Sequence, residues 1–144
     1  MKKLFSLAVI LVLAVSMSFA LTVGSVQGLP AMNFDLVGPA SAQAMFSLAS
    51  ATNTAFSFGG RIEYDLKEGD IVSYGGYGLI QMMNNGTNTA SNLEGGVCLK
   101  AMLEGVTIIS DFTVLSIYSS GVAGASSTTT FGLTGATFGI LYEI

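Results

Sequence analysis

Few side chains in this sequence could carry out chemistry, and the residue types that are missing are as informative as those that are present. The chain of 144 residues contains no histidine. A Ser-His-Asp hydrolase, a histidine general base and a histidine-rich metal site would all lack their central residue. Glu63 and Asp65 could form an acid–base pair, but we expect them to balance nearby basic residues instead. The sequence therefore predicts a protein that is not an enzyme and that needs no cofactor or metal.

Two further features could in principle carry chemistry. Cys98 is the only cysteine, so an intrachain disulfide is excluded. Cys98 is expected on the polar face of its strand, and we interpret it as a small space-filling residue rather than a reactive thiol. Asn85-Gly86-Thr87 matches a glycosylation motif, but we interpret this common motif as part of a flexible loop.

The charged residues are positioned by a strict alternation of side chains in the segment FSFGGRIEYDL, residues 56–66. Its even-numbered positions carry Phe56, Phe58, Ile62, Tyr64 and Leu66, joined by Gly60. Its odd-numbered positions carry Arg61, Glu63 and Asp65 together with Ser57 and Gly59. Because successive side chains of a strand point to opposite faces, this segment predicts a strand with one apolar and one charged face.

Similar alternation, with turn residues at short intervals, predicts an all-β fold for the rest of the chain. The expected strands cover residues 21–28, 31–37, 42–51, 54–66, 71–83, 93–103, 106–118 and 131–144. The first two strands are placed on either side of Pro30, because proline lacks the backbone N–H that strand pairing needs. Long connections at 84–92 and 119–130 fall at one end of the expected sheet, and short ones at 67–70 and 104–105 at the other.

Some residues interrupt the alternation. The exceptions are Tyr77, Leu79, Ile109, Leu115, Ile117 and Leu141. In the strand at 106–118, the apolar face is expected to carry Phe112, Val114 and Tyr118.

The N-terminal segment is typical of a secretory signal peptide. Lys2 and Lys3 precede an apolar run, and Ser18-Phe19-Ala20 supplies small residues for cleavage. We expect a signal peptide over residues 1–20 and one domain over residues 21–144, with an uncleaved anchor as the alternative. Removing the signal leaves three basic residues against nine acidic ones. This balance predicts that the protein does not bind nucleic acid.

The apolar faces of the strands could contact three different environments: lipid, the core of a soluble secreted barrel that carries an apolar ligand, or neighbouring subunits in a secreted fibre. A soluble barrel needs charged residues on the outer side of every strand. Most strands here offer Ser, Thr, Gly and Gln, which suit a crowded lumen. Tyr64 and Tyr74 flank the short connection at 67–70, and Tyr142 is near the chain end. All three are expected at one rim on the apolar face, where an aromatic girdle would contact the membrane interface.

With these features the chain resembles the small outer-membrane β-barrel proteins of Gram-negative-type bacteria. In that family the last strand ends with alternating hydrophobic residues that the insertion machinery recognises. Phe138, Ile140, Tyr142 and Ile144 match this C-terminal insertion signal, although the family usually ends in Phe or Trp.

The resemblance implies an antiparallel up-and-down transmembrane β-barrel of about eight strands in the bacterial outer membrane. Its partners would be outer-membrane lipid and the barrel-insertion machinery. Side chains fill the interior of a barrel of this size, so an open porin is not expected. We expect a monomer with a structural or surface-interaction role in the cell envelope; the sequence identifies no external ligand.

The resemblance also gives the two strand faces specific surroundings. Phe58, Ile62, Val97, Leu99 and Phe138 would point into hydrocarbon. Counted from the short connections, Arg61 and Asp111 lie five residues along their strands, and Glu63 and Lys100 about three. These four residues are predicted to form a lumen charge network, because a charge inside a narrow lumen needs a partner.

Overall fold

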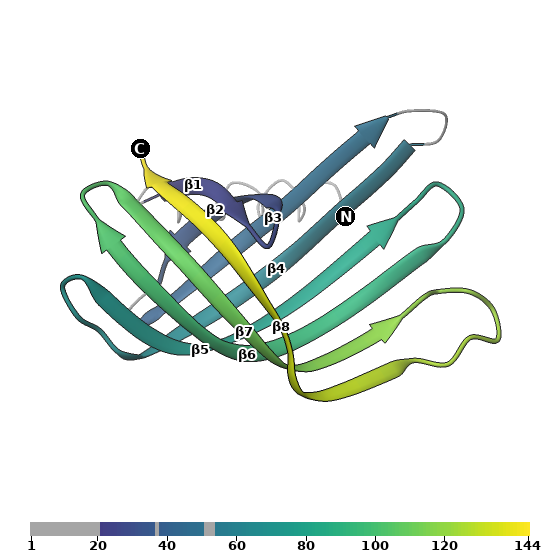
Figure 1. The fold of residues 1–144 in the computed structure, drawn as a ribbon. Coiled ribbons are helices and arrows are strands. Elements are labelled where there is room, and N and C mark those ends of the chain that lie inside the picture. Colours follow the sequence, from purple (N-terminus) through teal and green to yellow (C-terminus); the bar gives the residue numbers. More distant parts are fainter. Residues whose placement is uncertain (1–20, 37, 51–53) are drawn as a thin grey trace, which may run out of the picture.

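Eight antiparallel strands follow one another along the chain in the computed structural model, which describes residues 21–36, 38–50 and 54–144 (Figure 1). They are β1 (Leu21–Val26), β2 (Leu29–Asp35), β3 (Ala40–Ser50), β4 (Thr54–Lys67), β5 (Val72–Asn84), β6 (Thr89–Leu103), β7 (Val106–Ser119) and β8 (Thr128–Glu143). Each strand pairs with the next and β8 pairs with β1, so the sheet closes into a barrel. The predicted all-β, eight-stranded antiparallel barrel is confirmed. The predicted signal peptide at 1–20 lies outside the described residues.

Among the residues that the structure describes, no helix is long and apolar enough to cross a membrane. The start of β1 and the C-terminus lie at the same end of the barrel, which we call the C-terminal end (Figure 1). The strand ends joined by the turns 68–71 and 104–105, and the end of β2 with the start of β3, also lie at this end, whereas the described connections 27–28, 85–88 and 120–127 lie at the opposite end.

Two sequence expectations about the connections are wrong. Pro30 lies inside β2, opposite Ser25 of β1; the ladder with β3 begins only at Ala31, so β3 requires no donor from the proline. The long loop expected at 84–92 is a turn at 85–88, because Asn84 pairs with Thr89. The Asn85 side chain satisfies this turn by accepting hydrogen bonds from two backbone N–H groups at 3.0 and 2.8 Å. The contrast in connection length therefore depends mainly on the loop at 120–127.

A bulge in β7 accounts for part of the irregular alternation. Gly96 of β6 pairs with Thr113 and Gly95 with Leu115, so Val114 is an extra residue. Beyond it the faces exchange. Tyr118 pairs with Asn92 and shares its inward face, so its expected place on the apolar outer face is wrong.

The barrel wall is complete over only part of its height. β1 pairs with β8 from Thr22↔Glu143 to Ser25↔Ile140, and the β1–β2 hairpin then turns at Gln27 and Gly28, both with positive φ. In the part of the chain that the structure describes, residues 46–50 of β3 and 128–138 of β8 therefore pair on one side only. Figure 1 shows the longer hairpins β3–β4, β5–β6 and β7–β8 extending beyond β1–β2.

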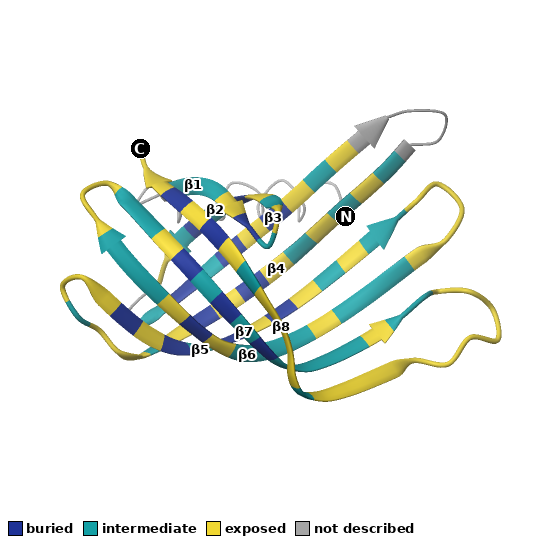
Figure 2. Ribbon diagram, viewed as in Figure 1, coloured by how far each residue is buried: buried dark blue, intermediate teal, exposed yellow. Residues whose placement is uncertain are grey.

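Buried and exposed positions alternate along the strands of the complete part of the barrel (Figure 2). The buried apolar residues inside it are Val26, Ala31, Met45, Tyr77, Leu79, Cys98, Ile109 and Leu141. Four of the interruptions in the sequence pattern are thus apolar residues that fill the lumen. The outer face carries large apolar side chains, among them Phe58, Ile62, Val97, Leu99 and Phe138.

Candidate functional site

Arg61 lies at the centre of a buried group of charges inside the barrel. Its Nη2 atom is 2.6 Å from Oδ1 of Asp111, although β5 and β6 separate their strands in the sheet. The contact therefore spans the lumen. Arg61 Nη1 also donates to Glu63, two residues away on the same face of β4. All three residues are about 1% exposed, so each charge depends on its partners for solvation.

Lys100 of β6 extends this group toward the C-terminal end. Its Nζ atom is 3.1 Å from Oε1 of Glu63 and 2.6 Å from Oδ2 of Asp65. The structure thus brings together the four predicted residues Arg61, Glu63, Lys100 and Asp111. Asp65 is a fifth member that the prediction omitted, although its odd position beside Glu63 was a signal for it.

Neutral residues complete the hydrogen bonding. Gln43 accepts a hydrogen bond from Arg61 at 3.0 Å and donates one to Glu63 at 3.0 Å. Ser41 donates to Glu63 at 3.3 Å, and Gln27 donates to Asp111 at 3.3 Å. Sequence reasoning missed these residues because a neutral polar residue on a lumen face has no distinctive pattern.

Tyr77 links the charges to the barrel wall. The Arg61 guanidinium carbon lies 4.8 Å from the centre of its ring, within the range of a cation–π contact. The Tyr77 hydroxyl is 2.7 Å from Oγ1 of Thr113 on β7. β6 lies between β5 and β7, and its residue Gly96 is the register partner of Tyr77. The ring thus fills space that a larger residue at Gly96 would occupy, because a Cβ there would be 2.9 Å from it.

A second polar group lies farther along the lumen, toward the incomplete part of the wall. Glu94 accepts hydrogen bonds from Asn92 at 2.6 Å and from Thr113 at 3.4 Å. Asn92 in turn accepts one from Ser116 at 3.2 Å. This group has an acid but no basic partner among the described residues.

Cys98 lies buried beside the carboxylates of Glu63 and Asp65, and the three potential ligand atoms are within 4.8 Å of one another. Such a set could hold a metal ion in principle. However, the Lys100 ammonium already contacts both carboxylates. Lys100 thus supplies these two carboxylates with the positive charge that a metal ion would otherwise supply.

The outward-facing predicted residues lie on the exposed face of the barrel. Tyr64, Tyr74 and Tyr142 are exposed. Each lies within a few residues of the point where its strand reaches the C-terminal end of the barrel. The residues of the predicted insertion signal, Phe138, Ile140, Tyr142 and Ile144, are also exposed.

Comparisons with protein-family models, with curated proteins and with solved structures found no match for this chain. The geometry of the barrel therefore carries the functional argument.

Proposed function

We propose that this protein is an integral β-barrel of a bacterial outer membrane with a structural or surface-interaction role. The observation that carries the proposal is a contrast between neighbours: Arg61 is 1% exposed, whereas Ile62 is 62% exposed. Water would favour the opposite arrangement. A lipid environment solvates the apolar side chain and excludes the charged one.

The exterior supports this proposal on a larger scale. Among the described strand residues, the charged side chains share the inward-facing positions, apart from Lys67 at the last position of β4. The apolar exterior runs over neighbouring strands and includes Phe58, Ile80 and Phe138. A soluble monomer rarely exposes an apolar patch of more than about a few hundred Å². Lipid would cover this surface without a protein partner.

The side chains inside the complete part of the barrel favour a closed lumen. Arg61 crosses it to Asp111, and the buried side chains of Tyr77, Leu79 and Ile109 also fill space in the interior. The proposal is therefore a monomeric barrel without an open pore. The barrel-insertion machinery would recognise the exposed residues of β8 from Phe138 to Ile144.

The two alternatives fit less well. A soluble carrier needs an apolar interior, but buried charges occupy the middle of this one. A fibre subunit has one observation in its favour: within the described part of the chain, residues 46–50 and 128–138 each leave one strand edge without a partner. Such edges can pair with other chains.

The electrophoretic mobility of the protein in SDS, with and without boiling, tests the proposal. Membranes from expressing cells are washed with carbonate, and the protein that remains is compared before and after heating. We expect a fast-migrating folded form that shifts on boiling. A Leu99→Arg variant, which places a charge on the outer face, should yield less of that form. A protein recovered in the carbonate wash without a heat shift would contradict the proposal, and SDS-resistant multimers would favour the fibre.

A further inference from the structure

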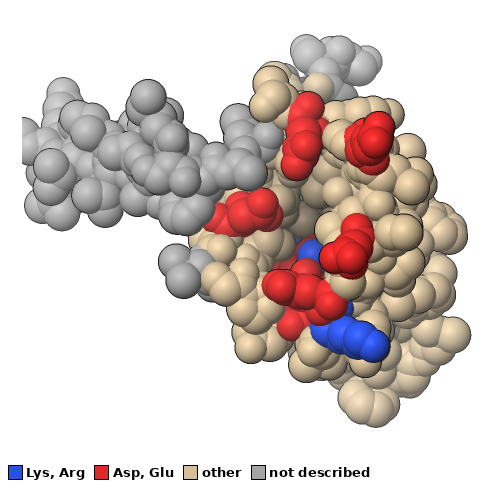
Figure 3. Space-filling model, turned by 90° about the vertical axis from the view of Figure 1, so that its left-hand side faces the viewer, with Lys and Arg blue, Asp and Glu red and all other residues tan. Residues whose placement is uncertain are grey.

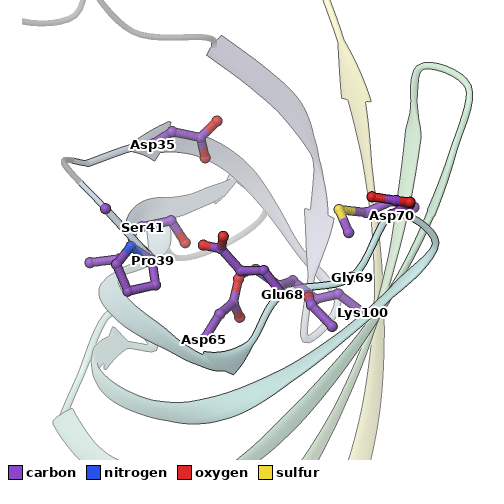
Figure 4. A pocket seen from close by; sticks show the side chains of 12 residues that line it. Asp35, Pro39, Ser41, Asp65, Glu68, Gly69, Asp70 and Lys100 are labelled. Carbon is purple, nitrogen blue, oxygen red and sulfur yellow. The ribbon is translucent and has the colours of Figure 1, made fainter.

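The C-terminal end of the barrel opens into a cavity of about 600 Å³. Four acidic residues line it: Asp35 from the end of β2, Asp65 from β4, and Glu68 and Asp70 from the β4–β5 turn (Figure 4). The basic residue in its lining is Lys100. Figure 3 views this end of the molecule and shows acidic side chains around a hollow, with basic atoms at its floor.

The charges in this cavity are unbalanced. The Lys100 ammonium is shared between Asp65 and the deeper Glu63. Asp35, Glu68 and Asp70 form no ion pair with any of the described residues. Asp35 accepts a neutral hydrogen bond from Asn33 at 3.1 Å. The cavity therefore attracts cations, and its walls concentrate that attraction.

Two residues of the cavity lining have buried oxygen atoms without a hydrogen-bond partner among the described residues. Ser73 is 1% exposed, and its Oγ atom has no partner within that part of the chain. The same holds for Oδ1 of Asp65 among the residues that the structure describes. A smaller adjoining cavity of about 150 Å³ shares Asp35 and Lys100 with the first, and Oδ1 of the buried Asn33 in its lining is a third such atom. Because a buried unpaired polar atom is costly, these oxygens are available to accept hydrogen bonds from a bound cation.

From these observations, we infer that the cavity at the C-terminal end binds an organic cation with two or more ammonium groups, of the polyamine class. One ammonium would donate to Asp65 Oδ1 and Ser73 Oγ. A second would contact the outer carboxylates of Asp35, Glu68 or Asp70. Lys100 shows that this end of the lumen can solvate an ammonium with two carboxylates.

The geometry favours an elongated cation over a metal ion. In the described part of the chain, the set of acids with ligand atoms within 4.8 Å of one another is Glu63 and Asp65 with Cys98, and Lys100 occupies it. The outer acids belong to no such set, whereas Ca²⁺ needs about six to eight oxygens close together. A cavity of about 600 Å³ is instead within the range of small organic ligands.

The chain's own N-terminus could compete for part of this charge. Cleavage after Ala20 would leave an α-ammonium on Leu21, whose register partner Phe34 precedes Asp35. One such group cannot balance the carboxylates of Asp35, Glu68 and Asp70 together. Binding should therefore be measured on the processed protein, which already contains this charge.

Spermidine binding to the folded protein in an uncharged detergent, measured by calorimetry, tests the inference. We expect saturable binding of one spermidine per barrel that weakens as salt is added. Glu68→Gln removes a carboxylate of the cavity, and Glu104→Gln removes one from the β6–β7 turn at the same end but outside the cavity lining. Glu68→Gln should weaken binding by about tenfold, and Glu104→Gln by less than about twofold.

Ser73→Ala provides a test without any change in charge. It should weaken binding several-fold while the barrel keeps its heat-modifiable band in SDS, because removing this hydroxyl breaks no hydrogen bond among the described residues. Three results would overturn the inference: no saturable spermidine binding, equal effects of Glu68→Gln and Glu104→Gln, or binding of Mg²⁺ or Ca²⁺ with this residue dependence in place of spermidine. Because the assay uses folded protein in detergent, each result leaves the membrane proposal to its own test.

Discussion

At the scale of single residues, Arg61 has two carboxylate partners that are not equivalent. Glu63 is also neutralised by Lys100, whereas Arg61 is the basic partner of Asp111 among the described residues. Removing Arg61 would therefore cost more at Asp111, which would be left buried without a basic partner among the described residues, than at Glu63. Breaking a buried ion pair by removing one partner costs more than replacing the whole pair.

The first prediction follows from this asymmetry. Arg61→Leu should lower the free energy of unfolding in lipid vesicles by about 3–5 kcal/mol, or less where water enters the lumen. Adding Asp111→Asn should restore more of this loss than adding Glu63→Gln, because Lys100 still pairs with Glu63. Urea titrations followed by circular dichroism would provide both double-mutant cycles. A neutral Arg61→Leu variant without coupling to Asp111 would show that these charges are solvated by bulk water.

The second prediction concerns the packing of Tyr77 against Gly96. A Cβ at Gly96 would overlap the backbone oxygen of Phe112, whereas a Cβ at Gly78 on β5 has no atom within 4 Å. Gly96→Ala should therefore destabilise the barrel by about 1–3 kcal/mol. Gly78→Ala, the matched control, should be neutral or slightly stabilising. Equal stabilities of the two variants in the urea assay would contradict the packing that we describe.

Part of this arrangement is predictable from residue types. The common parity of Arg61, Glu63 and Asp65 indicates that they share one face, and counting along strands brings Asp111 to the right level. The contact of Tyr77 with Arg61 is not predictable in this way. Tyr77 and Leu79 are apolar residues on a lumen face, and apolar character alone indicates the opposite face.

At the scale of secondary-structure elements, the period of two predicts the five strands from residue 54 onward, because this alternation survives wherever one face is buried. The three strands before residue 54 show it less clearly. The ends of the strands are less predictable. β6 starts at Thr89, four residues before the expected start at residue 93. The added residues are mostly polar and resemble a loop in the sequence, but polar residues can also continue a hairpin. The bulge at Val114 exchanges the faces of Leu115 and Ser116. Its signal in the sequence is the apolar pair Leu115 and Ile117, which breaks the alternation without showing where the extra residue lies.

The third prediction concerns the incomplete wall. Among the strands that the structure describes, residues 46–48 of β3 and 128–130 of β8 pair on one side only, whereas residues 80–82 of β5 pair on both sides. Backbone N–H groups without a strand partner exchange rapidly with water. Hydrogen exchange of the folded protein should be faster in the two edge segments than in β5. Protection of the edges equal to that of β5 would show that another strand or chain covers them.

At the scale of the whole molecule, the distribution of charged and apolar side chains is the reverse of that in a soluble barrel. The charges of Arg61, Glu63 and Asp111 lie in the interior, and large apolar side chains such as Ile62 and Ile80 cover the exterior. The sequence predicts this distribution through parity and the low share of charged residues, 10% of the chain. It does not reveal the height at which the wall is incomplete, since that depends on where the β1–β2 hairpin turns.

The fourth prediction tests most directly whether the exterior contacts lipid. The chain contains no tryptophan, so a single introduced tryptophan reports its own surroundings. Ile80 and Gln81 are neighbours on β5; Ile80 is exposed on the outer face, and Gln81 points inward, donating to Ser57 at 2.9 Å. The variants Ile80→Trp and Gln81→Trp therefore place the same fluorophore at one height on opposite faces.

The decisive measurement is the fluorescence of these two variants in vesicles whose acyl chains carry bromine, a quencher that acts at short range. We predict strong quenching of Ile80→Trp and weak quenching of Gln81→Trp, with both variants folded as judged by their heat-modifiable bands in SDS. Equal quenching of the two folded variants, or none in either, would contradict the account in which the apolar face of this barrel meets lipid.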